Sequence, residues 1–173
     1  MTEAQLSNAM DAYGSTVYRL ALTRMQNIAD AEDVYQEVFL RLWKQAAEDW
    51  DGDRAKAWLI RTTLNRCADL HRFRLRRPVL SFAEIPDLAQ PEDESRELWE
   101  AVSRLPEKAR TAVHLYYAEG YSAEEISQLM HIPAATVRTR LHRARKQLKD
   151  LLGGIDDETC VSRSDGTNFG PQR

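Results

Sequence analysis

Apolar residues between Tyr121 and Lys149 recur at helical spacing on both sides of a short break. Ile126 and Leu129 form the first stripe. The second stripe recurs at intervals of four, three and four residues, at Val137, Leu141, Ala144 and Leu148. Such spacing is typical of amphipathic α-helices that bury one face. The pattern therefore predicts two short helices around a tight turn.

Local sequence signals support both helices. Ser122 followed by Glu125 is a capping box, which predicts a helix start at Ala123. Pro133 lacks an N–H and has a fixed φ, so it suits the first turn of the second helix rather than its interior. Gly120, just upstream, is a good left-handed C-cap for a preceding helix. The segment is predicted to be a helix-turn-helix.

The rest of the chain is also predicted to be helical, which makes the fold class all-α: two small helical domains, the second with four helices. Asp30 is expected to be the N-cap of the second helix. Tyr35, Phe39 and Trp43 of that helix lie four residues apart and form an aromatic stripe. Such a stripe belongs to the core more often than to an interface, but we interpret part of it as a partner site. The expected helices are 11–25, 31–47, 54–76, one containing Leu98, Val102 and Leu105, and 107–119.

Three prolines and no sustained period between residues 78 and 93 predict a flexible acidic linker. The expected division is therefore an N-terminal domain at 1–77, the linker at 78–93, a C-terminal domain at 94–152 and a disordered polar tail at 153–173. The apolar runs are shorter than the roughly 20 residues of a membrane-spanning helix, and the N-terminus does not resemble a signal peptide. We expect a cytoplasmic protein without membrane insertion.

Charge is strongly segregated on a chain whose formal net charge is -3. Residues 61–77 hold six arginines against the single Asp69, and residues 134–149 hold six basic residues and no acidic one. Residues 78–104 between them hold seven acidic and two basic residues. Two basic blocks separated by an acidic stretch indicate two contacts with one polyanion.

Catalysis and metal binding have little support in the sequence. It contains neither a Gly-rich phosphate loop nor a zinc-protease or nucleophile motif, so we expect no enzyme activity, catalytic residue or cofactor. Cys67 and His71 would share a helix face, but two ligands do not make a zinc site. Two cysteines, Cys67 and Cys160, are too few for a disulfide framework and fit a reducing cytosol.

Nucleic-acid binding has good support. Because a recognition helix usually presents its N-terminal residues to the bases, Thr136, Arg138, Thr139 and Arg140 are expected at base edges. Arg143, Arg145, Lys146 and Lys149 are expected at phosphates. In the first domain, cationic residues beside Trp58 and Phe73 suit single-stranded DNA, although a structural role for Trp58 is an equally good explanation.

Three segments of the chain, in the order in which they occur, resemble segments of the ECF (extracytoplasmic function) subgroup of bacterial RNA polymerase sigma factors. DAEDVYQEVFLRLW at 30–43 is similar to the polymerase-binding helix, and AWLIRTTLNRCADLHRFRLRR at 57–77 to the segment that opens and reads the −10 promoter element. LPEKARTAVHLYYAEGYSAEEISQLMHIPAATVRTRLHRARKQL, from residue 105, is similar to the domain that reads the −35 element. Many relatives carry Leu-Gly where this chain has Met130-His131, so His131 is expected either to adopt a left-handed conformation or to alter the turn.

The resemblance implies a role for matching residues only. Those that would bind core RNA polymerase are Asp33, Gln36, Glu37, Phe39, Leu40 and Trp43. Those that would handle the −10 strand are Arg61, Asn65, Asp69 and Arg72, to which the residue pattern above adds Trp58. Those that would engage the −35 duplex are Arg138, Arg140, Arg143 and Lys146, to which the residue pattern adds Thr136 and Thr139. The implied partners are core RNA polymerase, promoter DNA and an anti-sigma factor, whose identity no residue here gives.

Two other classes of protein share some of these features. A stand-alone helix-turn-helix regulator would explain the basic helix, but not the aromatic and acidic helix after Asp30 or the second basic block. An enzyme acting on nucleic acid, such as a nuclease, would need a ligand or nucleophile cluster that the sequence does not offer. Co-purification with core polymerase and metal-dependent DNA cleavage would separate the three hypotheses.

Overall fold

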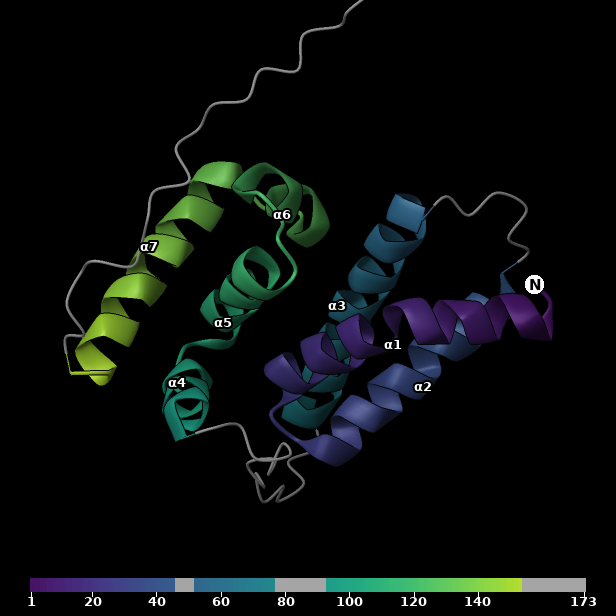
Figure 1. Ribbon diagram of the computed structural model, residues 1–173, viewed down its shortest axis with the longest axis horizontal. Coiled ribbons are helices and arrows are strands. Elements are labelled where there is room, and N and C mark those ends of the chain that lie inside the picture. The colour runs from purple at the N-terminus through teal and green to yellow at the C-terminus, as the bar shows by residue number, and fades with distance from the viewer. Residues whose placement is uncertain (46–51, 77–92, 154–173) are drawn as a thin grey trace, which may run out of the picture.

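The computed structural model describes residues 1–45, 52–76 and 93–153, and every regular element in these ranges is helical. The first group comprises α1 (Glu3–Met25), α2 (Ile28–Lys44) and α3 (Gly52–Arg76). The second comprises α4 (Asp93–Ser103), α5 (Glu107–Val113), the π-helical turn η1 (His114–Ala118), α6 (Ala123–Met130) and α7 (Ala134–Leu151). The prediction of an all-α chain with two helical domains is confirmed (Figure 1). Most of the predicted linker and nearly all of the predicted tail lie outside the described residues.

The three helices of the first group start earlier than expected, and α3 does so by two residues, at Gly52. α1 begins at Glu3 rather than residue 11, because Thr2 and Gln5 form a capping box at its N-terminus. The cap of α2 is Asn27, whose side chain accepts a hydrogen bond from the N–H of Asp30. The prediction of Asp30 as N-cap was therefore wrong. Its buried carboxylate instead pairs with Arg74 of α3 and ties two helices together.

The first domain packs α1, α2 and α3 around one apolar cluster. Val17 of α1, Val34 and Val38 of α2, and Leu59 of α3 are at most 1% exposed within it. Burial of a Val or Leu side chain contributes about 1.5–3 kcal/mol, so this cluster is the main source of the domain's stability. Most of the functional candidates on α2 and α3 are exposed, on faces turned away from this cluster.

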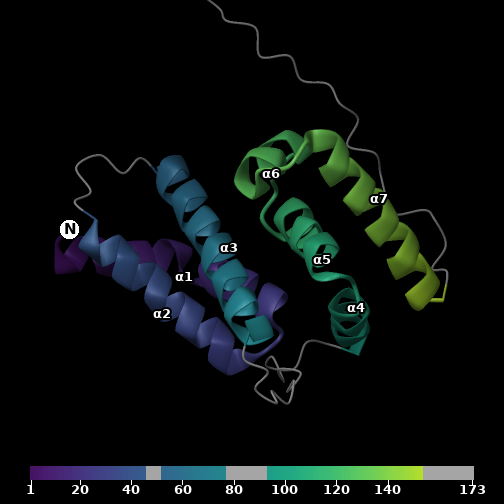
Figure 2. The same ribbon diagram turned by 180° about the vertical axis from the view of Figure 1, so that it is seen from behind.

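The second domain places α5 beside α7, with α6 closing one end (Figures 1 and 2). Leu115, Ile126, Val137 and Leu141 are at most 3% exposed and form its centre. The predicted helix over 107–119 is interrupted, because residues 114–118 widen into a π-helical turn in which the N–H of Glu119 reaches the carbonyl of His114 at 3.2 Å. Such turns are frequent at functional positions.

The two domains are packed against each other. Leu20 of α1 and Ile60 and Leu64 of α3 belong to the same buried cluster as the core of the second domain. The contacts run from α1 to α5 and from α3 to α6. Nothing in the sequence periodicity distinguished these positions from ordinary core residues of the first domain, so this packing was not predicted.

Candidate nucleic-acid interface

The helix-turn-helix is built as its sequence signals predict. The Ser122 hydroxyl accepts a hydrogen bond from the Glu125 N–H at 3.3 Å, and the Glu125 carboxylate accepts from the Ser122 N–H at 2.8 Å. This capping box starts α6 at Ala123. Gly120, the predicted left-handed cap, has φ +76°.

The turn between α6 and α7 depends on a non-glycine residue in the left-handed region. His131 has φ 52° and ψ 47°, which confirms the first of the two expectations for this position. The Ile132 N–H then reaches back to the Ser127 carbonyl at 3.1 Å. A left-handed residue with a Cβ costs roughly 1–2 kcal/mol, so the turn keeps the usual helix-turn-helix geometry at an energetic cost.

α7 separates an apolar face from a cationic face. Val137, Leu141 and Ala144 are at most 3% exposed and pack against the rest of the domain. The exposed residues include most of the predicted DNA contacts: Arg138, Thr139, Arg143, Arg145, Lys146 and Lys149. Thr136 and Arg140 are half-buried. The structure thus brings the predicted −35 residues to one helix and leaves its basic side chains largely in solvent.

One predicted base contact already has a partner within the domain. Arg138 forms an ion pair with Glu124 of α6, and the two side chains are 60% and 63% exposed. Ion pairs at such exposure are weak, because water and salt screen them. Arg138 can therefore exchange Glu124 for a nucleic-acid acceptor at little cost.

A second polar, largely cationic surface lies along α3. Arg61, Asn65 and Arg72 are exposed, while Asp69 is half-buried and pairs with Arg72 at 2.9 Å. Trp58 is half-buried and packs against the core of the first domain. The predicted −10 residues therefore share one helix, with Trp58 in a position that also has a structural role.

The face of α2 carries most of the predicted polymerase contacts. Asp33 and Gln36 are exposed, and Leu40 and Trp43 are large apolar side chains at 52% and 42% exposure. Phe39 differs, since it is 4% exposed and packs on the Tyr35 ring at a centroid distance of 4.8 Å. Its side chain supports this surface from beneath.

Glu37, the remaining acidic candidate on α2, pairs with Arg41 one helical turn away. The separation between the Arg41 Nε and the Glu37 carboxylate is 2.9 Å. This hydrogen bond lowers the pKa of Glu37, so the carboxylate is ionised at neutral pH. The α2 face thus combines anionic groups with exposed apolar groups, which is a composition suited to a protein partner.

The described residues also bear on the weaker candidates. Cys67 is fully buried, and burial raises the pKa of its thiol to about 12. Its neighbour His71 faces Glu107 at 3.7 Å. No group of three or more metal-binding side chains occurs in the part of the chain that the structure describes.

None of the helices described at 1–45, 52–76 and 93–153 is long and apolar enough to cross a membrane.

Comparison with known protein families matches both domains. Residues 9–77 match sigma-70 region 2, and residues 95–148 match sigma-70 region 4. The chain thus has the two helical domains of a sigma factor. Among curated relatives, the ECF RNA polymerase sigma factor SigW of Bacillus subtilis is 31% identical, with 84% of this chain and 89% of that protein covered. SigE of Mycolicibacterium smegmatis is 35% identical over 161 residues, which cover 87% of this chain and 62% of that longer protein.

Solved structures show the same fold. The sigma factor RpoE from Bartonella quintana, in complex with the anti-sigma factor NepR, has a TM-score of 0.73 at 23% identity, covering 88% of this chain and 99% of that chain. CnrH, in complex with the cytosolic domain of CnrY, has a TM-score of 0.62 at 25% identity, covering 90% and 92%. The chain belongs to the ECF group of RNA polymerase sigma factors.

Proposed function

We propose that this chain directs core RNA polymerase to a class of promoters by reading the −35 element with α7 and the −10 element with α3. The observation that carries this function is the exposed basic face of α7 in an intact helix-turn-helix, within a chain that belongs to the ECF sigma factors. The protein acts in the cytoplasm as an initiation factor and has no catalytic role of its own.

The −35 contact is assigned to the N-terminal half of α7. Thr136, Arg138, Thr139 and Arg140 lie in its first two turns, where a recognition helix meets base edges. Arg143 and Lys146 lie further along the exposed face, at a position suited to phosphates. An Arg guanidinium can donate two hydrogen bonds to the edge of one guanine, so Arg138 and Arg140 are the expected sources of sequence preference.

The −10 contact is assigned to the exposed side of α3. Arg61 and Arg72 supply positive charge for the strand, and Asn65 between them offers both a donor and an acceptor to a base edge. Asp69 pairs with Arg72 at 2.9 Å, and because both side chains are largely exposed this pair is also weak. A base displaced from the duplex could be captured here, with Trp58 as a neighbouring aromatic surface.

The polymerase contact is assigned to α2 through Asp33, Gln36, Glu37, Leu40 and Trp43, with Phe39 packed beneath them. Exposed apolar side chains beside carboxylates favour a protein partner over DNA, since carboxylates repel phosphates. An anti-sigma partner is also proposed, because the RpoE relative was solved with such a factor. In this proposal residues 1–77 bind polymerase and the −10 element, and residues 94–152 bind the −35 element, with 78–93 linking them.

Two substitutions on α7 test the DNA assignment. Arg138→Ala is expected to weaken binding of the holoenzyme to promoter DNA by about 1–3 kcal/mol and to relax selection at one base position. Lys149→Ala is expected to weaken binding to all DNA sequences equally. It should also reduce the slope of log affinity against log salt concentration by about 1. Arg96→Ala is the matched control, since Arg96 is exposed and pairs with Glu100 within α4. Equal losses on all sequences for Arg138→Ala would overturn its base-reading role.

A charge reversal on α2 tests the polymerase assignment. Asp33→Arg is expected to reduce association with core polymerase while leaving the helical circular dichroism spectrum unchanged, because Asp33 is exposed. Wild-type affinity in this variant would remove the α2 face from the interface. Failure of the wild-type chain to co-purify with core polymerase, combined with retained DNA binding, would favour a stand-alone regulator instead.

A further inference from the structure

The C-terminal half of α7 presents a row of cations that lack an anionic partner within the part of the chain that the structure describes. Its four basic residues, called here the basic half of α7, are all exposed: Arg143, Arg145, Lys146 and Lys149. Like charges three or four residues apart on a helix repel each other, and α7 itself contains a single acidic residue, Asp150. This surface therefore favours an anion.

The N-terminal half of α7 differs in this respect. Arg138 already forms an ion pair with Glu124 of α6, although both side chains are largely exposed. None of the ion pairs among the described residues involves the basic half of α7. The two halves of the helix thus differ in whether the domain supplies a counter-charge.

α7 ends in a turn that directs the chain back towards this surface. The Leu152 N–H donates to the Leu148 carbonyl at 2.9 Å, and Gly153 follows in the left-handed region with φ +72°. At helix ends of this kind, the residue after the left-handed position commonly contacts the last helical turn. Such a turn favours an exit beside α7 rather than along its axis.

Three consecutive carboxylates follow this turn in the sequence, called here the acidic run: Asp156, Asp157 and Glu158. They come four to six residues after Leu152, a length of chain that spans at most about 14 to 21 Å. Along the helix, Leu152 lies about 9 Å from Lys146 and about 14 Å from Arg143. Arg138, at about 21 Å, lies at the limit of a fully extended chain. The acidic run can therefore reach the basic half of α7 but not the residues expected at base edges.

The covalent connection decides whether so exposed a contact can form. Each exposed ion pair is weak, because water and salt screen it. A short tether, however, raises the local concentration of the acidic run at α7 to the millimolar range. DNA is the stronger competitor, since its phosphates release condensed counterions when cations bind them. The contact would thus form in the free chain and yield to a duplex.

We propose that the acidic run binds the basic half of α7 in the free chain and competes there with DNA phosphates. The competition rests on the proposed function, whereas the contact itself is a property of the free chain. Because phosphate contacts carry no sequence information, the acidic run lowers the affinity for all duplexes alike and leaves base selection unchanged.

Paramagnetic relaxation in the full chain tests the contact. A nitroxide is attached to Cys160, two residues beyond the acidic run, while the buried Cys67 stays unlabelled. The reference is a neutral variant of equal length: Asp156→Asn, Asp157→Asn and Glu158→Gln. In about 50 mM salt, the amide signals of residues 143–149 should be broadened more in the unaltered chain than in the neutral variant, and about 0.5 M salt should remove the difference. Equal broadening at low salt would refute the contact.

Binding of several short duplexes of unrelated sequence tests the competition. The neutral variant should bind each of them several-fold more tightly than the unaltered chain, and its affinity should fall more steeply with salt, because no internal ion pairs have to be broken. The matched control makes the same change in net charge at three exposed carboxylates of the first domain: Glu3→Gln, Asp11→Asn and Glu32→Gln. It should bind much as the unaltered chain does.

The comparison of the two variants separates the explanations. An equal gain in the neutral variant and the control would reduce the effect to net charge, and no gain in either would also overturn the competition. A gain confined to particular sequences would show that the acidic run covers base-reading residues, contrary to the proposal. If no form binds any duplex, the assignment of α7 to DNA fails, while the relaxation data still decide whether the acidic run contacts α7.

Discussion

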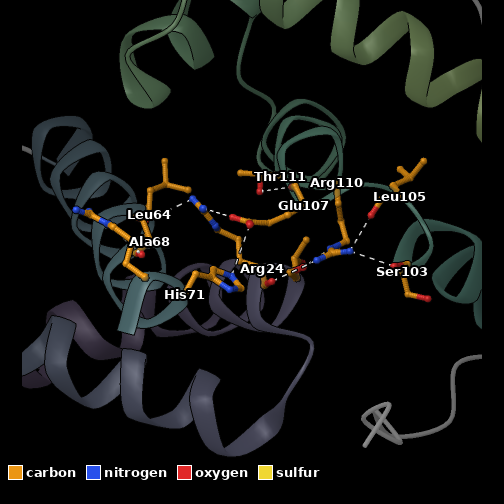
Figure 3. Close-up of polar contacts among 11 residues, drawn as sticks. Arg24, Leu64, Ala68, His71, Ser103, Leu105, Glu107, Arg110 and Thr111 are labelled. Carbon is orange, nitrogen blue, oxygen red and sulfur yellow. Dashed lines mark hydrogen bonds and ion pairs between the residues drawn. The ribbon is translucent and has the colours of Figure 1, made fainter. Parts of the chain in front are cut away.

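Replacing Arg110 is expected to destabilise the protein more than replacing any neighbouring arginine. The residue is 6% exposed. Its guanidinium donates to the carbonyls of Ser103 at 3.0 Å, Leu105 at 2.9 Å and Arg24 at 3.2 Å, and also to that of Thr23 (Figure 3). It therefore connects α1 to the α4–α5 turn through a single side chain.

The magnitude follows from those four hydrogen bonds. A hydrogen bond to a charged group contributes about 1.5–3 kcal/mol, but removal of the guanidinium also removes its desolvation cost. Breaking a buried charged network by deleting one member costs about 3–5 kcal/mol, and we expect this loss for Arg110→Ala. Arg110→Lys keeps the charge but not the planar fork of donors, so its loss should be smaller, about 1–3 kcal/mol.

Urea unfolding followed by circular dichroism at pH 7 measures these losses. Arg104→Ala serves as the control, because Arg104 is exposed and its removal should change the free energy of unfolding by no more than about 0.5 kcal/mol. A loss below about 1 kcal/mol for Arg110→Ala would refute the reasoning, since the carbonyls of Thr23, Arg24, Ser103 and Leu105 would then have found other partners without cost.

Three further predictions concern titration and backbone strain. Burial lowers the pKa of His114, so the unfolded chain binds more protons than the folded chain below about pH 6.5. The free energy of unfolding should therefore decrease as the pH is lowered from about 7.5 to about 5.5. Urea titrations across this range should show a smaller decrease in His114→Gln. Because burial raises the pKa of the Cys67 thiol to about 12, a Cys160→Ser chain should react with a thiol reagent at pH 8 only when unfolded, and rapid labelling of the native protein would contradict this burial. His131→Gly should raise the free energy of unfolding by about 1 kcal/mol, since the left-handed backbone no longer carries a Cβ; a measurable loss would show that the imidazole makes a contact worth more than the strain.

Local features of the fold were predictable wherever a short motif determines the structure. The Ser122–Glu125 capping box, the left-handed Gly120 and the apolar face of α7 all lie where the sequence placed them. Asp30 shows the limit of such reasoning. Asn27 and Asp30 are both good caps, and tertiary contact with Arg74 decided between them, because it gave the Asp30 carboxylate a buried partner on another helix.

The contact between domains could not be read from the sequence. Leu20, Ile60 and Leu64 have the periodicity of core residues, but periodicity does not say which helix will cover them. Arg110 lies between Ala109 and Thr111 with charged residues just before it, so its burial was not evident from the sequence, although a buried guanidinium needs several acceptors. Phe39 shows the converse: the family resemblance implied a polymerase contact, whereas the aromatic stripe favoured the core, and packing on Tyr35 buries its side chain.

Run-off transcription with core RNA polymerase tests the central claim most directly. Genomic DNA fragments are transcribed by core polymerase with and without the chain, and start sites are mapped. The account predicts discrete transcripts that depend on the chain and share one pair of −35 and −10 sequences, with Arg138→Ala reducing their yield. The account is contradicted if core polymerase makes no additional transcript in the presence of the folded chain, although the same polymerase preparation makes transcripts with another sigma factor.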